Sequence, residues 1–476
     1  MKNELIQRRA IVSSHLYSKK YMEKRSQAAV LSPMRIVVVS FVLVILSGTL
    51  LLCLPFATRD GSIDLIDALF TATSATCVTG LIVYDTYSKF TLFGQIVIIC
   101  LIQIGGLGLV SFTTFFSIAA GRKLGFKSLK IASSSSSFDN LGEIQGLFFT
   151  IFKVVAMCES IGALLLATVL VPKFGIINGL WLSVFTSISA FCNAGFDLFG
   201  QVSPFISLMG FSNSIIVNFT VMGLIISGGL GFTVWHDFMF YKKQGKFKIS
   251  FHSKLVLIMT ASLIFGGAFI ILILEWNNPN TMRDLPVWEK IMASFFQSVT
   301  TRTAGFNTID QNGMYGLSKA VSSFLMFVGA APGGTGGGIK VTTFAVLIVT
   351  VFSVVRGRSE AIFLGHKIDK YTVYKSLSIT CLALLAVCIT SLTVYYTSNN
   401  PLVTGINSLF ESFSAFATVG LSTGVTGVMS FAGKIFTILS MFLGRVGPVT
   451  LAISLSLKYN DYSQREIVPD GKITVG

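Results

Sequence analysis

Four octapeptides that share one pattern are the part of this sequence best suited to chemistry, and the groups they offer are backbone carbonyls. Each octapeptide has a glycine at its seventh position, followed by Leu or Phe. The glycines recur at intervals of 110 to 115 residues, which chance would not produce four times, so we predict an internal fourfold repeat. The copies read SATCVTGL (74–81), SAFCNAGF (189–196), VTTRTAGF (299–306) and SAFATVGL (414–421).

The glycines of these octapeptides, Gly80, Gly195, Gly305 and Gly420, permit a turn whose carbonyls can bind a cation. Glycine adopts backbone dihedral angles that other residues enter at a steric cost, so successive carbonyls can point the same way. A ring of such oxygens replaces the hydration shell of an ion. The octapeptides contain no carboxylate, which favours monovalent potassium over calcium. Each turn has one glycine where a typical potassium channel filter has two, so we expect looser selectivity, with sodium open as a second ion.

The composition identifies a membrane protein. The 476 residues are 52% hydrophobic and only 12% charged, with a mean hydropathy of +0.75. A soluble globular protein is normally about 25% charged. The net charge of +15 comes from basic blocks between apolar runs, so lipid headgroups and membrane topology explain it better than nucleic acid.

Eight apolar runs are long enough to cross a bilayer core, which takes about 20 residues. They begin near Ile36, Thr91, Leu147, Ser212, Leu255, Val321, Val373 and Ile435. Between the members of each consecutive pair lies a shorter stretch that leads into an octapeptide: 62–76, 176–190, 286–300 and 404–416. Each shorter stretch is either an amphipathic surface helix or a re-entrant helix, and the glycine turn that follows favours the second interpretation. Irregular backbone at membrane depth must line a watery cavity or be buried by protein.

The predicted fold is an all-α membrane protein of four repeats. Each repeat has a span, a re-entrant pore helix with its filter loop, and a second span, and the repeats are arranged pseudo-fourfold around one central pore. The C-terminal, partially negative ends of the pore helices should point to the centre. Most Lys and Arg residues lie in the N-terminal arm, in the connections after the second, fourth and sixth spans, and in the tail. Because basic residues are enriched on the cytoplasmic side of membrane proteins, both termini are expected to be cytoplasmic.

The expected domains are a cytoplasmic basic arm (1–35), pore repeat one (36–120), a cytoplasmic loop (121–146), pore repeat two (147–235), pore repeat three (254–355, with a glycine-rich gate loop at 329–340), pore repeat four (373–458) and a cytoplasmic tail (459–476).

The sixth apolar run is interrupted by the sequence GAAPGGTGGGIK at 329–340. In a helix interior glycine costs about 1 kcal/mol and proline about 3 kcal/mol relative to alanine, so this segment breaks the helix. We expect a movable gate across the pore, and the alternative is a kink that eases packing. The order G-x-x-x-x-G-K-[ST] of a phosphate-binding loop is not met, so no nucleotide site is expected on this chain. The gate residues are Gly333, Gly334, Thr335, Gly336, Gly337, Gly338 and Lys340.

Two arginines lie at positions that could affect ion passage through a pore. Arg445 falls in the last apolar run, and an arginine at that depth marks a functional position by default. We expect an electrostatic barrier below the filter, and the alternative is a structural ion pair with Glu159. Arg302 lies within the third octapeptide and either supports the filter from behind or reaches the outer vestibule.

The sequence contains no recognisable catalytic set. A Ser, His and Asp set, an HExxH motif and paired acids in an apolar pocket are all missing, and the four histidines lack the spacing of a metal site. The seven cysteines form no CxxC pair, so zinc and disulfide frameworks are not expected. We therefore predict that the chain is not an enzyme.

Several independent motifs occur in one order and resemble the Trk/Ktr/HKT superfamily of potassium transporters over about residues 36 to 458. These motifs are the fourfold plan with its single filter glycines, the TTRTAGFNT segment at 300–308, the glycine-rich break before Lys340, and Arg445. Eight spans without an extra N-terminal pair look most like KtrB, the membrane subunit of bacterial Ktr systems. The long basic N-terminal arm departs from that pattern.

The resemblance implies sodium-stimulated potassium uptake across the bacterial plasma membrane. It also implies a homodimer, each protomer with its own pore, on a cytoplasmic nucleotide-binding ring of a KtrA-type regulatory subunit. By match of position, the ion contacts would be the four glycines and the carbonyls of Val78, Thr79, Asn193, Ala194, Thr303, Ala304, Thr418 and Val419.

Two other function classes stay open on the sequence. One is a stand-alone potassium or sodium channel that works without a regulatory ring. The other is a membrane enzyme or a solute transporter built from inverted repeats. The shared orientation of the four glycine turns argues against the second class, because inverted repeats would place two of them on the cytoplasmic side.

Overall fold

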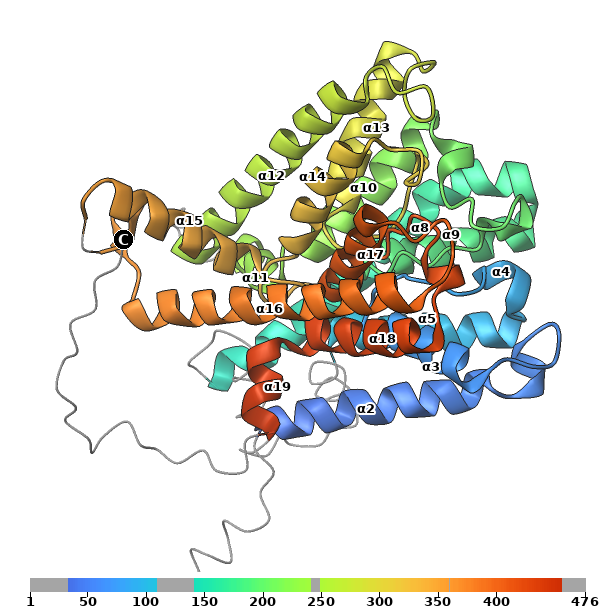
Figure 1. The fold of residues 1–476 in the computed structure, drawn as a ribbon, viewed down its shortest axis with the longest axis horizontal. Helices are drawn as coiled ribbons and strands as arrows, with labels where there is room; N and C mark the ends of the chain where they lie inside the picture. Colours follow the sequence, from blue (N-terminus) through green and yellow to red (C-terminus); the bar gives the residue numbers. More distant parts are fainter. Residues whose placement is uncertain (1–32, 109–140, 241–248, 359, 456–476) are drawn as a thin grey trace, which may run out of the picture.

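The computed structural model describes residues 33–108, 141–240, 249–358 and 360–455, and almost all of them belong to helices or the turns between them (Figure 1). The N-terminal arm through residue 32, most of the predicted cytoplasmic loop at 121–146 and the tail at 459–476 lie outside the described residues. The domain boundaries placed in those segments therefore remain predictions.

Each repeat begins with a long helix followed by a short one. The long helices are α2 (Pro33–Leu52), α8 (Leu141–Phe174), α12 (Phe251–Glu275) and α16 (Lys370–Thr397). The short helices are α3 (Leu65–Thr76), α9 (Ile176–Phe191), α13 (Val287–Thr300) and α17 (Gly405–Ala417). Each short helix ends within an octapeptide, as the sequence predicts.

The long helices have the length and composition of membrane spans. Within each, a segment of 18 to 28 residues with mean hydropathy between 2.3 and 2.6 is long enough to cross a membrane. Their outward side chains are large and apolar; Leu43, Leu164, Phe269 and Leu392 are all exposed. Because water would oppose such a surface, the exposed side chains indicate contact with lipid.

The second apolar run of each repeat forms broken or short helices. These are α5 (Leu92–Leu107); α10 (Ile215–Gly229) with α11 (Phe232–Phe240); α14 (Gly316–Phe327) with α15 (Val341–Val355); and α18 (Phe431–Val446) with α19 (Pro448–Leu455).

The sequence analysis anticipated an interruption only in the sixth run, and the structure has others. The axes of α10 and α11 differ by 93°, with Gly231 at φ +86° between them. Gly447 at φ +90° separates α18 from α19, and α5 ends at Gly108 with φ +79°. A glycine in the left-handed region is a common end of a helix, which accounts for these breaks.

Small elements complete the chain. They are α4 (Thr86–Lys89), the 3-10 turns η1 (Pro55–Ala57), η2 (Phe199–Gln201), η3 (Met209–Phe211) and η4 (Thr426–Val428), and the antiparallel strands β1 (Ile362–Phe363) and β2 (His366–Lys367). The two strands pair Ile362 with Lys367 and Phe363 with His366, and their hairpin connects α15 to α16.

Helix contacts connect the repeats in a closed order. The second helix of each repeat packs on the short helix of the next: α5 on α9, α10 on α13, and α14 on α17. The last repeat closes this order, because α18 packs on α3 of the first. In Figure 1 the blue and red ends of the described chain accordingly lie together, with α2, α3 and α18 side by side. The short helices are thus enclosed by the longer ones.

Three glycines let the second helices approach the short helices closely. A Cβ atom on Gly105 would lie 1.9 Å from the carbonyl oxygen of Thr76, and one on Gly228 would lie 1.9 Å from that of Phe191. A Cβ atom on Gly444 would lie 1.6 Å from the oxygen of Phe416. The three carbonyls occupy the same place, the third position of their octapeptides. Any side chain at these glycines would push the second helix away from the turn.

We predict that Gly444→Ala destabilises the protein by about 1 to 3 kcal/mol, the usual cost of overpacking a core. Gly223→Ala is the matched control, because Gly223 lies in α10 and a Cβ atom there would have no neighbouring atom within 4 Å. That change should leave stability unchanged or raise it, since alanine is the better helix former. Thermal unfolding of both variants in detergent measures the difference, and equal melting temperatures would contradict the close-approach argument.

Candidate functional site

The four octapeptides adopt one backbone conformation at two positions. The seventh residues Gly80, Gly195, Gly305 and Gly420 have φ of +90°, +69°, +79° and +92°. The fifth residues are also left-handed, although none is glycine: Val78 has φ +58°, Asn193 +59°, Thr303 +67° and Thr418 +53°. A β-branched residue at positive φ is an outlier in proteins, and such strain concentrates at functional sites.

The four glycines meet in a closed cycle. A Cβ atom on Gly80 would lie 2.4 Å from the carbonyl oxygen of Ala194, and one on Gly195 would lie 2.8 Å from that of Ala304. A Cβ atom on Gly305 would lie 2.5 Å from the oxygen of Val419. For Gly420 the corresponding atom is the oxygen of Thr79, at 2.2 Å, which returns the cycle to the first repeat. The residues predicted to bind ions are therefore brought together, and a side chain at any of the glycines would collide with its neighbour.

Hydrogen bonds to the short helices fix these turns. The Gly80 N–H donates to Ser74 Oγ at 3.1 Å, and the Gly420 N–H donates to Ser414 Oγ at 3.0 Å. In the third octapeptide Thr300 Oγ1 instead donates to the carbonyl of Phe306 at 2.6 Å. The repeats therefore share a backbone path without sharing every contact.

The second and third turns are also tied to each other. Asn193 Nδ2 donates to the carbonyl of Arg302 and to Thr303 Oγ1, both at 3.3 Å. The Arg302 side chain is 6% exposed, does not line the outer cavity, and has no hydrogen-bond partner for Nη1. Arg302 is therefore buried away from the cavity, and its expected support of the filter through hydrogen bonds to neighbouring carbonyls remains a prediction.

An outer cavity of about 650 Å³ lies over the ring of glycines. All four turn glycines line it, together with polar side chains and the carboxylates of Asp197 and Asp310. Asp197 is 8% exposed, and burial raises the pKa of its carboxyl to about 7. The Phe199 N–H, which donates to Asp197 Oδ1 at 3.0 Å, opposes this rise, whereas the nearby Asp85 carboxylate adds to it. The cavity therefore has two carboxyl groups just outside the ring, and that of Asp197 becomes fully ionised only above pH 7.

The glycine-rich segment 329–340 lies on the other side of the ring. Thr335 Oγ1 donates to the carbonyl of Phe191 at 3.2 Å, and the Gly337 N–H donates to Thr418 Oγ1 at 3.0 Å. A Cβ atom on Gly336 would lie 1.9 Å from Thr303 Oγ1. The predicted gate residues thus touch the turns of three repeats, and the small size of glycine allows that contact.

The broken end of α10 holds this segment in place. The N–H groups of Ala331 and Thr335 donate to the carbonyls of Gly229 and Gly228 at 3.0 and 3.2 Å. The break at Gly231 leaves these carbonyls without partners in their own helix, and the segment supplies the missing donors. Lys340 Nζ donates to the carbonyl of Gly336 at 2.7 Å, which closes the segment on itself.

Arg445 joins this segment to the first repeat. Its Nη1 donates to the carbonyl of Thr335, and its Nη2 donates to the carbonyls of Gly105 and Gly106. Within the described part of the chain, no ion pair connects Arg445 to Glu159, whose carboxylate accepts from Gln103 Nε2 at 3.0 Å. The expected alternative, a structural pair with Glu159, is therefore not what the structure contains.

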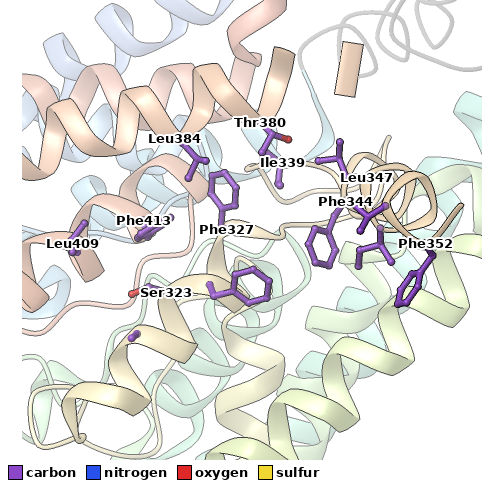
Figure 2. Close-up of a pocket in the computed structure, with 14 residues that line it drawn as sticks. Ser323, Phe327, Ile339, Phe344, Leu347, Phe352, Thr380, Leu384, Leu409 and Phe413 are labelled. Atoms are coloured by element: carbon purple, nitrogen blue, oxygen red, sulfur yellow. The ribbon is translucent and has the colours of Figure 1, made fainter. Parts of the chain in front are cut away.

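A second cavity, of about 550 Å³, lies between α14, α15, α16 and α17 (Figure 2). Its walls are apolar, with Phe327, Ile339 and Phe413 among the side chains that point into it. The hydroxyls of Ser323 and Thr380 each donate to a carbonyl of their own helix, at 2.8 and 3.0 Å. With no polar group to spare, this cavity suits hydrocarbon and offers no route to an ion.

The chain is similar to cation transport proteins. The family described as TrkH, cation transport protein, matches residues 2–465. The Ktr system potassium uptake protein B of Bacillus subtilis is 39% identical over 94% of this chain and 97% of its own length. The potassium/sodium uptake protein NtpJ of Enterococcus hirae is 36% identical over 96% of this chain and 99% of its own length. The crystal structure of the potassium transporter TrkH from Vibrio parahaemolyticus shares the fold, with a TM-score of 0.67 at 18% identity over 90% of this chain and 86% of that one.

We predict that Asp197→Asn makes stability less dependent on pH. A folded-state pKa near 7, above the ordinary value of about 3.9, means that the folded protein holds this proton more tightly than the unfolded chain does. The wild type should therefore gain stability as pH falls from 8 through 7 toward 4. The asparagine variant should be more stable than the wild type at pH 8, by several degrees of melting temperature, and should lose this advantage at pH 5. Parallel melting curves across this range would contradict the raised pKa.

Proposed function

This chain belongs to the TrkH family of cation transport proteins, and we propose that it is the pore-forming subunit of a potassium uptake system. It is a multi-pass membrane protein that transports cations and not an enzyme. The observation that carries the proposal is the closed cycle of four glycine turns, in which backbone carbonyls from four separate repeats converge.

In the proposed mechanism the four repeats surround one pore in pseudo-fourfold fashion, and potassium is the substrate that passes through it. The ion sheds water at the ring and is solvated by backbone oxygens of the turns. The short helices end at these turns, so their partially negative C-termini add attraction for a cation. We assign the contacts to the carbonyls of Val78, Thr79, Gly80, Asn193, Ala194, Gly195, Thr303, Ala304, Gly305, Thr418, Val419 and Gly420.

The outer cavity would collect ions before they enter the ring. Asp310 lines its wall, as does Asp197, which carries its charge above pH 7. Negative charge in a confined cavity raises the local concentration of cations. Because this cavity would be the outer vestibule, we place it on the extracellular side. Both chain termini would then be cytoplasmic, in agreement with the distribution of Lys and Arg.

We propose that the segment 329–340 is a gate and that Arg445 helps to keep it closed. The segment lies against the inner side of three turns, so an ion leaving the ring would meet it first. Arg445 donates to the Thr335 carbonyl of this segment and to the Gly105 carbonyl of α5. It therefore connects the segment to the first repeat. The guanidinium also places positive charge on the inner side, where it opposes the passage of a cation.

Relatives support a multi-protein assembly. Two relatives are named protein B and protein D of the Ktr system, which implies that the membrane subunit works with regulatory partners. We propose a homodimer on a KtrA-type cytoplasmic ring that binds nucleotides, since this chain has no phosphate-binding motif of its own. The name of NtpJ includes sodium, which supports sodium as a second ion or a stimulating one. A stand-alone potassium or sodium transporter is the second candidate.

Uptake of radioactive rubidium by proteoliposomes tests the function. We expect uptake that external potassium inhibits strongly and sodium inhibits weakly, with a further response to a nucleotide-binding partner. Uptake that no partner changes would favour the stand-alone transporter. Liposomes that take up no more rubidium than empty ones would reject the proposal.

We predict that Gly305→Ser raises the KM for potassium about tenfold, which corresponds to about 1.4 kcal/mol of lost binding. Gly305 has φ +79°, and a Cβ there would lie 2.5 Å from the carbonyl of Val419, so serine must distort the ring. Gly316→Ser is the control, because Gly316 begins α14 with open space around it. Unchanged uptake kinetics in Gly305→Ser would remove this residue from the filter.

We predict that Arg445→Ala speeds rubidium flux several-fold in proteoliposomes, because the change removes both the contact that holds the Thr335 carbonyl and the positive charge beneath the ring. Arg445→Lys should lie between the wild type and the alanine variant, since lysine keeps the charge but lacks the fork of donors that reaches two carbonyls. Slower flux through a correctly folded alanine variant would contradict the assignment of Arg445 to the closed gate.

A further inference from the structure

A buried glutamate lies behind the fourth turn, outside the ring of carbonyls described above. Glu411 belongs to α17, the short helix of the fourth repeat, and is 0% exposed. Its Oε1 accepts from Ser422 Oγ at 2.6 Å and from the Thr423 N–H at 2.9 Å. Its Oε2 accepts from Thr426 Oγ1 at 2.8 Å. One carboxylate therefore holds three residues of the segment that directly follows the turn.

Glu411 is hydrogen-bonded on both oxygens and has no partner of opposite charge in the described part of the chain. The Thr423 N–H can only donate to Glu411, and the hydroxyls of Ser422 and Thr426 complete the set of contacts on its two oxygens. Among the residues that the structure describes, no ion pair includes Glu411. Burying a charge is costly unless hydrogen bonds compensate for it, so this set of donors is a built feature of the fourth repeat.

Helix α17 holds the fourth turn at two places. It binds Gly420 through Ser414, and it binds the residues that follow the turn through Glu411. On the inner side, Ser414 Oγ of α17 accepts from the Gly420 N–H. On the outer side, Ser422 Oγ accepts from the Gly424 N–H at 2.9 Å while it donates to Glu411. Ser422 and Gly424 line the outer cavity. The width of the ring on this side therefore depends on a rigid connection from α17 through Glu411.

The other repeats have no carboxylate at the position that corresponds to Glu411. In the third repeat the nearest counterpart is neutral: the side-chain amides of Gln297 and Gln311 exchange hydrogen bonds at 2.7 and 3.0 Å. Three residues before the first and second octapeptides, where Glu411 stands in the fourth, the chain has Thr71 and Thr186. Thr71 Oγ1 donates within its own helix to the carbonyl of Asp67. In α3 the buried carboxylate of Asp67 is instead paired with Lys434 and hydrogen-bonded to Tyr84, whereas Glu411 has no cationic partner among the described residues.

We propose that Glu411 is a positioning residue that sets the preference for potassium over sodium by holding the fourth turn at the span potassium requires. This inference rests on the proposed function of the ring. Selectivity by backbone oxygens depends on their spacing and on how freely they move. Without Glu411 the turn can move inward and bind the smaller sodium ion, so the difference in affinity between potassium and sodium decreases.

Two substitutions of Glu411 separate spacing from charge. Glu411→Gln keeps the size of the side chain but replaces one acceptor oxygen by an NH2 group, so it cannot accept hydrogen bonds on both sides as the carboxylate does. Glu411→Asp keeps the charge but is one methylene shorter, so it cannot reach both Ser422 and Thr426. If position decides, both variants should lose about tenfold in the preference for potassium over sodium, which corresponds to about 1.4 kcal/mol between the two ions. A charge effect alone would leave Glu411→Asp like the wild type and would overturn the proposal.

Glu275→Gln is the matched control. Glu275 is also 0% exposed and accepts from Asn278 Nδ2 and Thr281 Oγ1, both at 2.6 Å, and from the Tyr315 N–H at 3.0 Å. It lies at the end of α12, and none of these partners belongs to an octapeptide. Glu275→Gln therefore makes the same chemical change in a similar network, and its ion preference should match that of the wild type.

The measurement is rubidium uptake by proteoliposomes, inhibited by increasing external potassium or sodium. We expect the ratio of the two inhibition constants to fall in both Glu411 variants and to stay constant in Glu275→Gln. The inference would be overturned if the wild type and the three variants had the same ratio. It would also be overturned if the ratio fell as much in Glu275→Gln as in the Glu411 variants. If the Glu411 variants do not fold, Thr426→Val removes one donor and should lower the ratio, and an unchanged ratio there overturns the inference as well. A wild type that takes up no rubidium would reject the proposed function itself, whereas a wild type that takes up rubidium without distinguishing the two ions would overturn this inference alone.

Discussion

The structure depends on the close approach of four backbone turns that have no room for side chains. Glycine at the seventh position of each octapeptide satisfies two demands at once, because φ is positive there and because the next turn's carbonyl lies within contact distance. A left-handed residue two positions earlier is needed as well, and Val78, Thr303 and Thr418 occupy that conformation although it strains a β-branched residue. The surrounding helices hold this strain in place, since the second helix of each repeat packs on the short helix of the next.

Much of this arrangement could be predicted from the sequence because its signals are local. The octapeptides indicated the number of repeats and the turn glycines, and the six glycines of 329–340 marked a break in the sixth apolar run. The left-handed fifth positions could not be foreseen, because Val, Asn and Thr are ordinary residues whose conformation here is imposed by the neighbouring turns. The same holds for Gly105, Gly228 and Gly444, which look like any glycine in an apolar helix until the packing of α5, α10 and α18 is known.

The partners of the buried charged residues were also beyond the sequence. Glu159 was the obvious acid for Arg445, yet the guanidinium lies against backbone carbonyls of α5 and of the glycine-rich segment, while Gln103 donates to Glu159. Carbonyls exposed by a helix break or at a helix end are strong acceptors, but only the folded chain shows where they lie. The network around Glu411 was missed for a related reason, since its donors follow the turn by several residues and are serines and threonines of no distinctive pattern.

The closed cycle of turns is made by one continuous chain, and this has a consequence for how such a protein can change over evolutionary time. In a pore assembled from four identical subunits, a single codon alters every quarter of the ring together. Here a mutation alters one quarter and leaves three intact. The repeats already differ in this way: the fourth has a carboxylate behind its turn, the third has paired amides, and the second has an asparagine that donates to the third turn. In the proposed pore, a substitution behind one turn would therefore change the preference between ions in a small step.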